Sequence, residues 1–512
     1  MKRSTWLAAL AFGAALATGA PEALAQRKGG DVVVAMVQAP PSLDAHVTTA
    51  QVARNVVLHL YETLYARDEN AKPVPELAEG VKISEDGRTY VFPIRRGVKF
   101  HNGKELDAND VVASLERYRK LGATPTLLAA IDTVKATGPY EVTVALKTVQ
   151  STFLDNLSSP RAPIAIYPAE EAAKPANQIS FIGTGPFRFV EYKPDSHVRI
   201  ARFDGYVPNP NASGRDGFAG RKEVLVDSVT FRFMPEAGAR TAAFEAGEVH
   251  FVETVDGPTA KRLEGNRNHA VYKVLPFAFQ VIKFNHAQAP GDDPHFRRAV
   301  MTALDKEEIM AIAFPDIYQM DGAWLYPRSP FHMAAGTEGY NKADLSAAKA
   351  MLQKSSYKGE KLTFIIDNLR SNVDTATVLQ GRLKEIGVNV ELSVADWPTV
   401  SKVGFTDTGW HFWTHGFGIE PFEGPASVMA PWVNGTSQRK KDETIDRLSA
   451  ALNAEMDEGK RRAIFAEFQK HMYDQAVAVK AGNYGIFQVA TAKLKNFTPY
   501  RIPRMWGVSL EP

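Results

Sequence analysis

The 512-residue sequence contains no cysteine. This absence excludes disulfide bonds, lipid attachment at a cysteine, thiol catalysis and thiolate metal sites. A chain of this composition must hold itself together by burying apolar surface, and its length permits that. At roughly 150 residues per unit, the length predicts about three structural units.

The sequence also lacks a strong charge of either sign. It has 60 lysine and arginine residues against 58 aspartate and glutamate residues, which gives a formal net charge of +2. Because no basic arm or stripe is present, we expect no nucleic-acid partner. Hydrophobic residues make up 45% and charged residues 23% of the chain, a composition typical of a folded globular protein.

Long apolar runs are missing beyond the N-terminus. There, two basic residues precede an apolar run over residues 7–17, and residues 23–25 (ALA) have the small-x-small pattern of a cleavage site. This arrangement is typical of a secretory signal peptide over residues 1–25, with a mature start at Gln26. A membrane anchor is disfavoured, because a spanning helix needs roughly 20 apolar residues. We therefore expect a protein of the Gram-negative periplasm.

Motifs that would support catalysis are missing as well. Gly183-Thr184-Gly185 has Arg188 where a dinucleotide-binding fingerprint needs its third glycine. The chain has neither a G-x-x-x-x-G-K-[ST] phosphate loop nor a G-x-S-x-G nucleophile elbow. We therefore assign no catalytic residue and no cofactor. A triad of distant residues stays open as an alternative, because such groups need to be adjacent only in space.

Hydrophobic periodicity predicts the first elements of the chain. An apolar run over residues 31–36, followed by two prolines, is typical of a buried strand. Apolar residues four apart predict a helix over residues 52–65. The turn dipeptide at residues 86–87 (DG) predicts a hairpin that joins residues 81–83 to residues 89–94.

A segment near residue 100 carries turn and capping signals; residues 95–118 read RRGVKFHNGKELDANDVVASLERY. Asn102-Gly103 predicts a hairpin turn, and Asp107 is a typical N-cap for the helix that follows. Asp110 places a second carboxylate in the first turn, where the helix dipole favours it. Capping explains these carboxylates better than acid–base catalysis does.

The second half of the sequence alternates helices and strands. We predict helices over residues 296–304, 345–353, 375–386, 442–452 and 458–472, and strands over residues 361–366 and 388–394. Such alternation favours an α/β unit with helices packed on a sheet. No internal repeat or low-complexity linker marks a domain boundary.

Residues 95–118 closely resemble the solute-binding proteins of the peptide, opine and nickel class of ABC importers, often called family 5 extracellular binding proteins, which include dipeptide- and oligopeptide-binding proteins. Residues 60–78 resemble the family's helix and loop before that segment. Residues 183–189 (GTGPFRF) resemble its turn into a strand, and residues 285–305 resemble its later helix. These segments occur in the family's order and spacing over most of the chain.

The resemblance implies an α/β, two-lobed periplasmic binding protein fold, class II-like and of cluster C, with an extra domain inserted in the first lobe. Projected onto this sequence, lobe I takes residues 26–61, 183–284 and 481–512, the inserted domain takes residues 62–182, and lobe II takes residues 285–480. The resemblance also implies a small-molecule or peptide ligand in an interlobe cleft. It further implies that the protein delivers this ligand to the transmembrane permease subunits of an ABC importer. We expect the protein to be a monomer.

Two segments align with the strands on which the family binds its ligand. The ligand-binding residues that the resemblance implies there are Thr48, Thr49, Gln51, Trp413, Thr414, His415, Gly416 and Phe417. In peptide binders, an extended ligand adds to such strands through backbone hydrogen bonds, which give affinity without reading side chains.

One position departs from the family pattern. Peptide binders similar to this chain read close to W-x-x-D-x-x-[DE]-P, and their aspartate pairs with the ammonium of the peptide. Glu420-Pro421 fixes the register, so Phe417 stands at the aspartate position and Thr414 at the aromatic one. An ammonium buried there would lack its partner and incur a desolvation cost. A carboxylated or aromatic non-peptide solute, or a sugar, therefore stays open beside a peptide or modified amino acid.

Further ligand-binding residues are implied outside these segments. Arg370 lies close to where dipeptide-binding relatives carry an arginine for the ligand carboxylate, and a surface arginine is the alternative. Trp397 belongs to a group of aromatic residues that either offer flat faces to a ligand or pack in the core. The group consists of Trp397, Trp410, Trp413, Phe417, Phe422 and Trp432.

His411 and His415 raise the possibility of a metal site. Residues four apart lie about 5–6 Å apart on a helix, whereas a strand separates them by about 13 Å. The aromatic alternation and the family match favour a strand, so we assign no metal ligand. A nickel complex stays a minor alternative, and an exported hydrolase is the alternative of another class.

Overall fold

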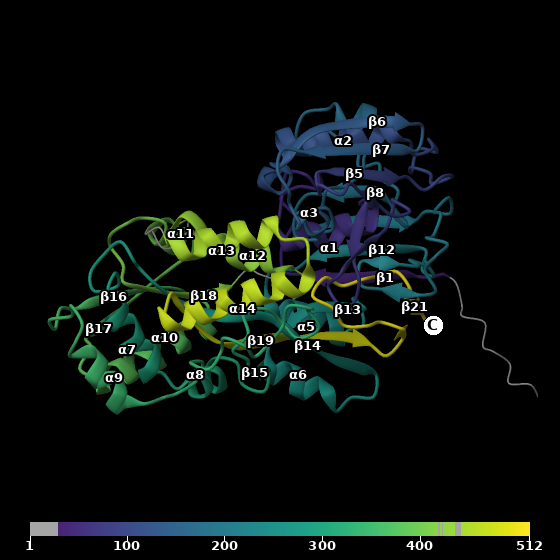
Figure 1. Cartoon of the computed structure of the whole chain (residues 1–512). Coiled ribbons are helices and arrows are strands. Elements are labelled where there is room, and N and C mark those ends of the chain that lie inside the picture. The colour runs from purple at the N-terminus through teal and green to yellow at the C-terminus, as the bar shows by residue number, and fades with distance from the viewer. Residues whose placement is uncertain (1–28, 418–419, 422, 436–441) are drawn as a thin grey trace, which may run out of the picture.

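The structure is a computed structural model that describes residues 29–417, 420–421, 423–435 and 442–512. The predicted signal peptide and the predicted start at Gln26 lie outside these residues. Figure 1 shows a unit that contains α2 and the strands β5 to β7 above a larger body, in which strands are flanked by helices.

One sheet of 11 strands runs through the larger body, in the order β17-β16-β18-β14-β19-β13-β1-β12-β9-β8, with β15 paired to β19. Its strands are β1 (Asp31–Met36), β8 (Phe187–Lys193), β9 (His197–Arg202), β12 (Ser228–Phe233), β13 (Phe251–Val255), β14 (His269–Phe284), β15 (Tyr318–Gln319), β16 (Leu362–Asp367), β17 (Val390–Ala395), β18 (Phe412–Phe417) and β19 (Ala478–Thr491).

Smaller sheets complete the strand inventory of the described residues. A four-stranded sheet has the order β4-β5-β7-β6, and three sheets have two strands each. The four strands are β4 (Lys82–Ile83), β5 (Thr89–Pro93), β6 (Ile131–Gly138) and β7 (Glu141–Leu146). The pairs are β2 (Tyr65–Arg67) with β3 (Pro73–Pro75), β10 (Arg215–Asp216) with β11 (Ala219–Gly220), and β20 (Leu494–Lys495) with β21 (Ser509–Leu510).

Helices cover these sheets. They are α1 (Gln51–Leu60), α2 (Ala108–Leu121), α3 (Phe153–Leu157), α4 (Ala169–Ala172), α5 (Ala237–Glu245), α6 (Gly257–Glu264), α7 (Pro294–Ala303), α8 (Lys306–Ala313), α9 (Leu345–Leu352), α10 (Arg370–Glu385), α11 (Trp397–Gly404), α12 (Pro425–Met429), α13 (Glu443–Ala454) and α14 (Glu458–Asp474), with 3-10 turns η1 (Pro125–Leu128) and η2 (Ala430–Gly435). In the described part of the chain, no helix has both the length and the apolar character to cross a bilayer.

Three large hydrophobic cores underlie the fold. One surrounds β1, β12 and α1, a second fills the unit of β4 to β7 and α2, and a third surrounds β16, β18 and α10. The strands β14 and β19 pass from the third core to the first. In β19, Val479 packs in the third core and Ala490 in the first. The ladder between the two strands is interrupted between Val274 and Ala278.

Predictions for the first half are confirmed with one exception. The strand over residues 31–36 is β1, and the hairpin is β4 paired antiparallel with β5. The Asp107 carboxylate accepts hydrogen bonds from two backbone amides of α2. The predicted helix over residues 52–65 is wrong at its end: α1 ends at Leu60, because Tyr61 has extended backbone and Leu64 packs in the core of the α2 unit.

Predictions for the second half are also confirmed in outline. The predicted helices correspond to α7, α9, α10, α13 and α14. The predicted strands are β16 and β17, which pair in parallel and are joined by α10. The start of α10 was wrong by one turn or more. This helix begins at Arg370, because Leu369 has extended backbone and its amide donates to the Asp367 carboxylate at 2.9 Å.

Candidate ligand-binding site

A buried ion-pair cluster joins the first and third cores. Arg54 of α1 donates two hydrogen bonds of 2.6 Å to Glu420, which follows β18. Arg501, near the C-terminus, approaches the same carboxylate at 2.9 Å. Burial by itself would raise the pKa of Glu420, but the charges of Arg501 and Arg54 outweigh it and lower the pKa to about 2. Glu420 therefore stays ionised and holds segments of both sides together.

The strand β18 lies between β14 and β16. It pairs with β14 along its whole length, from Phe412 to Phe417. Its parallel pairing with β16 covers only Phe412, Trp413 and Thr414. The register therefore leaves His415, Gly416 and Phe417 without a β16 partner, at the end of β18 that leads to Glu420. Such an edge is the feature on which an extended ligand adds as a strand.

One face of β18 is aromatic and surrounds a lysine. Trp413, His415 and Phe417 alternate along this face, and Lys283 of β14 lies opposite Trp413. The Lys283 ammonium lies 5.0 Å from the ring centre of Trp413 and 5.6 Å from that of Phe417. The ring of Phe417 stacks on that of Trp432, with 5.5 Å between centres and 9° between planes. Phe417 is thus a packed core residue, with 3% of its surface exposed.

The electrostatics of this face follow from burial. Desolvation lowers the pKa of Lys283 to about 7. Desolvation, helped by the nearby charge of Lys283, lowers the pKa of His415 to about 3, so the imidazole is neutral. Its Nδ1 lies 2.9 Å from the carbonyl oxygen of Gly416, and its Nε2 has no hydrogen-bond partner among the described residues.

The other face of β18 points into the third core. The Thr414 hydroxyl donates to the carbonyl of Val281 at 2.9 Å and accepts from the Gln280 amide at 2.8 Å. Gly416 leaves room for Tyr484, since a Cβ atom built on Gly416 would stand 2.1 Å from the Tyr484 hydroxyl oxygen. The side chain of Thr414 therefore supports the sheet, and Gly416 is required by close packing.

The first predicted segment lies at the start of α1. Thr48 accepts a hydrogen bond from the Ala50 amide at 3.1 Å, and Gln51 is the first residue of the helix. The carbonyl oxygen of Thr49 accepts from Nε of Arg54 at 3.2 Å. The ion pair with Glu420 therefore connects this segment to the end of β18.

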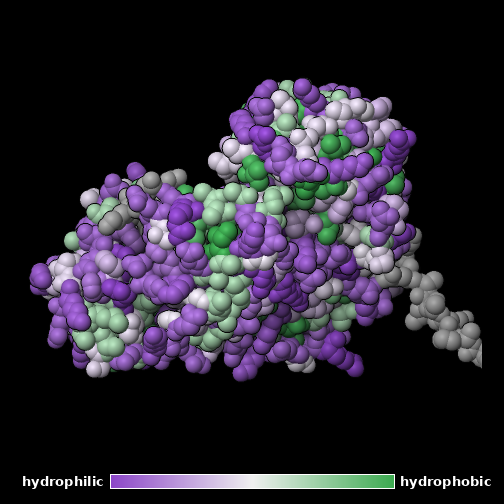
Figure 2. All heavy atoms as spheres, viewed as in Figure 1, coloured by the Kyte–Doolittle hydropathy of each residue, from purple (hydrophilic) through white to green (hydrophobic). Residues whose placement is uncertain are grey.

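A cavity of about 500 Å³ lies between the units. Its lining includes Thr49, Arg161 after α3, Glu423 before α12, and Asn453 of α13. Figure 2 shows mostly hydrophilic residues on this face of the molecule, with hydrophobic residues gathered where the α2 unit meets the larger body. The size suits a small organic ligand.

Of the ten residues predicted to bind a ligand, only Thr49 lines this cavity. Arg370 lines a different cavity, of about 840 Å³, that also borders α5 and α6. Its side chain is 88% exposed and pairs with Asp374 at 2.7 Å. Trp397, the first residue of α11, is 49% exposed and lies with its ring centre 6.0 Å from that of Trp413. The structure therefore brings together Thr49, Arg54 and the end of β18, and leaves Arg370 apart.

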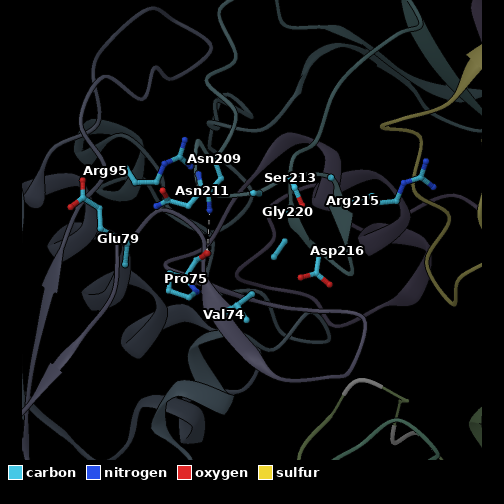
Figure 3. Close-up of a pocket in the computed structure, with 14 residues that line it drawn as sticks. Val74, Pro75, Glu79, Arg95, Asn209, Asn211, Ser213, Arg215, Asp216 and Gly220 are labelled. Atoms are coloured by element: carbon cyan, nitrogen blue, oxygen red, sulfur yellow. Dashed lines mark hydrogen bonds between the residues drawn. The ribbon is translucent and has the colours of Figure 1, made fainter. Parts of the chain in front are cut away.

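A third cavity, of about 470 Å³, lies between β3 and residues 209–220. Figure 3 shows Glu79 and Arg95 at one end of it and Asp216 at the other, while Arg215 points away. Arg95 donates to backbone carbonyls, and Asp216 accepts from the Glu69 amide at 3.0 Å. None of the residues predicted to bind a ligand lines this cavity.

Of the histidine pair, only His415 lies in the predicted strand, which is β18. His411 precedes β18 and is engaged through both ring nitrogens. Its Nδ1 accepts from the Thr363 amide at 2.9 Å, and its Nε2 lies 2.9 Å from the Gln288 amide nitrogen. No group of three or more potential metal ligands occurs within the residues that the structure describes.

Sequence reasoning missed several polar residues of the site. Lys283, Glu423 and Arg161 lie outside the aligned segments, and each is an ordinary charged residue in the sequence. One of them could have been found from the sequence. Residues 418–425 read GIEPFEGP, so a second acidic residue, Glu423, follows Glu420-Pro421 closely. Phe422, named among the aromatic residues, lies outside the described residues.

Comparisons with known proteins agree with this architecture. The oligopeptide-binding protein AppA of Bacillus subtilis is 29% identical over 72% of this chain and 70% of its own. A Sinorhizobium fredii protein named "Probable peptide ABC transporter periplasmic-binding protein y4tO" is 26% identical over 99% of both chains. The crystal structure of the ABC transporter substrate-binding protein CtaP of Listeria monocytogenes superposes with a TM-score of 0.82 at 21% identity, over 94% of this chain and 100% of CtaP.

The predicted fold class is confirmed: the chain has the two-lobed α/β fold of periplasmic binding proteins. Residues 72–439 match the family described as "Bacterial extracellular solute-binding proteins, family 5 Middle". The match covers well over half of the sequence, and the chain therefore belongs to the family 5 extracellular solute-binding proteins.

Proposed function

We propose that this protein captures a peptide or a modified amino acid between its lobes and delivers it to the permease subunits of an ABC importer without chemical change. The observation that carries the proposal is the cavity of about 500 Å³, which Thr49 lines from one side and Glu423 from the other. The family match and the peptide-binding names of the relatives support it.

The proposal includes an order of events. In a two-lobed protein, hinge closure sequesters the ligand and forms the surface that a permease recognises. We propose that lobe I, the inserted domain and lobe II have the predicted extents. We further propose that the chain crosses between the lobes near the interrupted ladder of β14 and β19. We also propose that the protein acts as a monomer in the periplasm, after removal of residues 1–25.

A retention experiment tests the function. The purified protein is incubated with a pool of dipeptides and tripeptides, separated from unbound solutes, and denatured, and the released solutes are identified by mass spectrometry. We expect unmodified peptides in about equimolar amount to the protein. The exported hydrolase, kept open from the sequence, predicts cleavage products and loss of intact peptide in the same samples. Turnover of the pool would refute the importer function.

The site residues also remain a proposal. Thr48, Thr49, Gln51 and the end of β18 from His415 to Phe417 are proposed to contact the ligand, mainly through backbone groups. A thermal-shift panel of peptides, carboxylated aromatic compounds, sugars and nickel distinguishes the peptide from the other solutes. A shift with sugars alone, or with nickel alone, would refute the peptide ligand while keeping the solute-binding function.

A further inference from the structure

One buried lysine differs from the others. The lysines buried in the described part of the chain are Lys222, Lys283, Lys306 and Lys480. Lys222 pairs with Glu76 at 3.0 Å, and both Lys306 and Lys480 donate to backbone carbonyls. The Lys283 ammonium has neither a hydrogen bond nor an ion pair among the described residues. Because lysines are almost never buried without a partner, Lys283 has the properties of a group whose partner arrives with a ligand.

Aromatic rings surround the Lys283 ammonium. Besides its contacts with Trp413 and Phe417, it lies 5.7 Å from the ring centre of Trp432. The faces of such rings attract a cation, but they do not accept the three hydrogen bonds that an ammonium can donate. The donors of Lys283 are therefore unused.

The ammonium is less enclosed than its polar neighbours. The indole nitrogens of Trp413 and Trp432 are fully buried without a partner, and so is Nε2 of His415. Nζ of Lys283 is not among these fully buried atoms. Trp397 is 49% exposed, and its ring centre lies 5.9 Å from that of His415, so the aromatic cluster extends to the surface. The lysine nitrogen is therefore available to a ligand group.

Lys283 also lies beside the edge proposed for the ligand. It is opposite Trp413 in the ladder of β14 and β18, and side chains alternate along a strand. The side chains of His415 and Phe417 therefore lie on the same face as Lys283. An extended ligand added beside residues 415–417 would place alternate side chains on this face too. A side group of the solute, rather than its backbone, would then meet the ammonium.

We propose that Lys283 is a specificity-determining residue of this site and binds a carboxylate that the solute carries outside its backbone. The inference rests on the proposed function, since it specifies the ligand class of the same site. A peptide with a glutamate or aspartate side chain carries such a carboxylate. An aromatic carboxylic acid carries one as well, on a ring that suits the aromatic cluster.

The preference follows from ordinary charge chemistry. An ammonium and a carboxylate form charge-assisted hydrogen bonds, which are strong where water is largely excluded. The corresponding carboxamide has no charge and leaves the ammonium without its counterion. We therefore expect an acid to bind at least about tenfold more tightly than its amide.

The test compares acids with their amides on matched variants. Tripeptides of glycine with one glutamate, placed at each position in turn, and their glutamine counterparts are titrated by isothermal calorimetry into the full mature chain. Benzoate and benzamide are the aromatic pair. Lys283→Met removes the ammonium, and Lys306→Met is the control, because Lys306 is an equally buried lysine that donates to the Met301 carbonyl at 3.4 Å. Circular dichroism and a thermal melt establish that each variant is folded.

The expected result is a loss of discrimination in one variant. Wild type and Lys306→Met should prefer the acid of at least one pair, whereas Lys283→Met should bind acid and amide equally. A preference for benzoate alone that depends on Lys283 would support the inference and place the carboxylate on an aromatic acid. Equal binding of acids and amides to wild type, a preference that survives in Lys283→Met, or binding of none of the acids would overturn it. Cleavage of the peptides would instead refute the proposed function.

A second measurement detects the proton that the bound carboxylate attracts. Desolvation lowers the pKa of Lys283 to about 7, so most of this amine is uncharged at pH 8. The neighbouring His415, with a pKa of about 3, stays neutral. A bound carboxylate favours the ammonium, so binding should take up a fraction of a proton from the buffer. Binding at pH 8 should therefore be less exothermic in Tris than in phosphate, because Tris absorbs heat when it releases a proton. Equal heats in the two buffers, or the same difference in Lys283→Met, would contradict the assignment.

Discussion

Replacing Glu420 by glutamine should destabilise the protein strongly, because it removes the single carboxylate shared by two buried arginines. The shift of the Glu420 pKa from 4.5 to about 2 gives the scale. At about 1.4 kcal/mol per pKa unit, the ionised form gains about 3 kcal/mol from its surroundings. This value agrees with the 3–5 kcal/mol, roughly, that breaking a buried ion pair costs. We therefore expect a loss of about 3–5 kcal/mol for Glu420→Gln.

The ranking of several variants by their loss of unfolding free energy is a sharper test than the loss of one variant. Arg54→Met leaves the pair of Glu420 and Arg501 in place, so it should cost less, about 1–3 kcal/mol. Arg370→Ala removes only an exposed pair and should change stability by less than about 0.5 kcal/mol. Urea unfolding, followed by circular dichroism and tryptophan fluorescence, measures these differences.

The pH dependence gives an independent check on Glu420. Because its pKa is lower in the folded protein, its contribution is fully present above the unfolded pKa of 4.5 and is lost as the pH falls towards about 2. The difference between wild type and Glu420→Gln should therefore shrink below pH 4.5. A constant difference from pH 7 to pH 3, or an equal cost for Arg54→Met, would refute the shared-carboxylate argument.

Three further predictions concern stability. Lys283→Met should stabilise the protein by about 2–4 kcal/mol at pH 7, because desolvation lowers the lysine pKa to about 7 in the folded state. Since the unfolded chain binds that proton more tightly, the free energy of unfolding of the wild type should rise from pH 7 to pH 10 more steeply than that of the variant. An equal pH dependence of the two proteins in urea unfolding would disprove the assignment. Gly416→Ala should lower the free energy of unfolding by about 1–3 kcal/mol, because the added Cβ atom meets the Tyr484 hydroxyl. Adding Tyr484→Phe should restore part of this loss, because it removes that hydroxyl. If thermal melts show no recovery in the double variant, the loss does not come from this contact. Asp107→Ala should cost about 1 kcal/mol through loss of the N-cap, whereas Asp107→Ser should cost little in the same melts.

The sequence predicted elements well where the signal is local. The cap at Asp107, the strand over residues 31–36 and the β16–α10–β17 unit each depend on a spacing within a few residues. Each is confirmed, except that α10 begins at Arg370, earlier than predicted. The end of α1 was wrong because Leu64 belongs to the core of a different unit, which periodicity alone does not reveal.

The site was harder to predict because its charges come from distant parts of the chain. The segment before Glu420-Pro421 is a strand, β18, as the sequence predicts. By the register of Glu420-Pro421, Phe417 stands at the position where the resemblance places the family's aspartate. That position is filled by a stacked aromatic core beside Lys283. Glu423 and Arg161 differ by more than 250 positions in the sequence, so only the folded chain shows that they line one cavity.

The crossing of β14 and β19 also constrains how the molecule can be divided. A fragment of residues 285–480, the stretch proposed for lobe II, would lack β14, the strand that pairs with β18 along its whole length. A truncation between β14 and β18 therefore leaves each fragment with an open, unpaired sheet edge, which favours aggregation. Separate study of each half would require a circularly permuted gene with new ends in surface loops, rather than a shortened one.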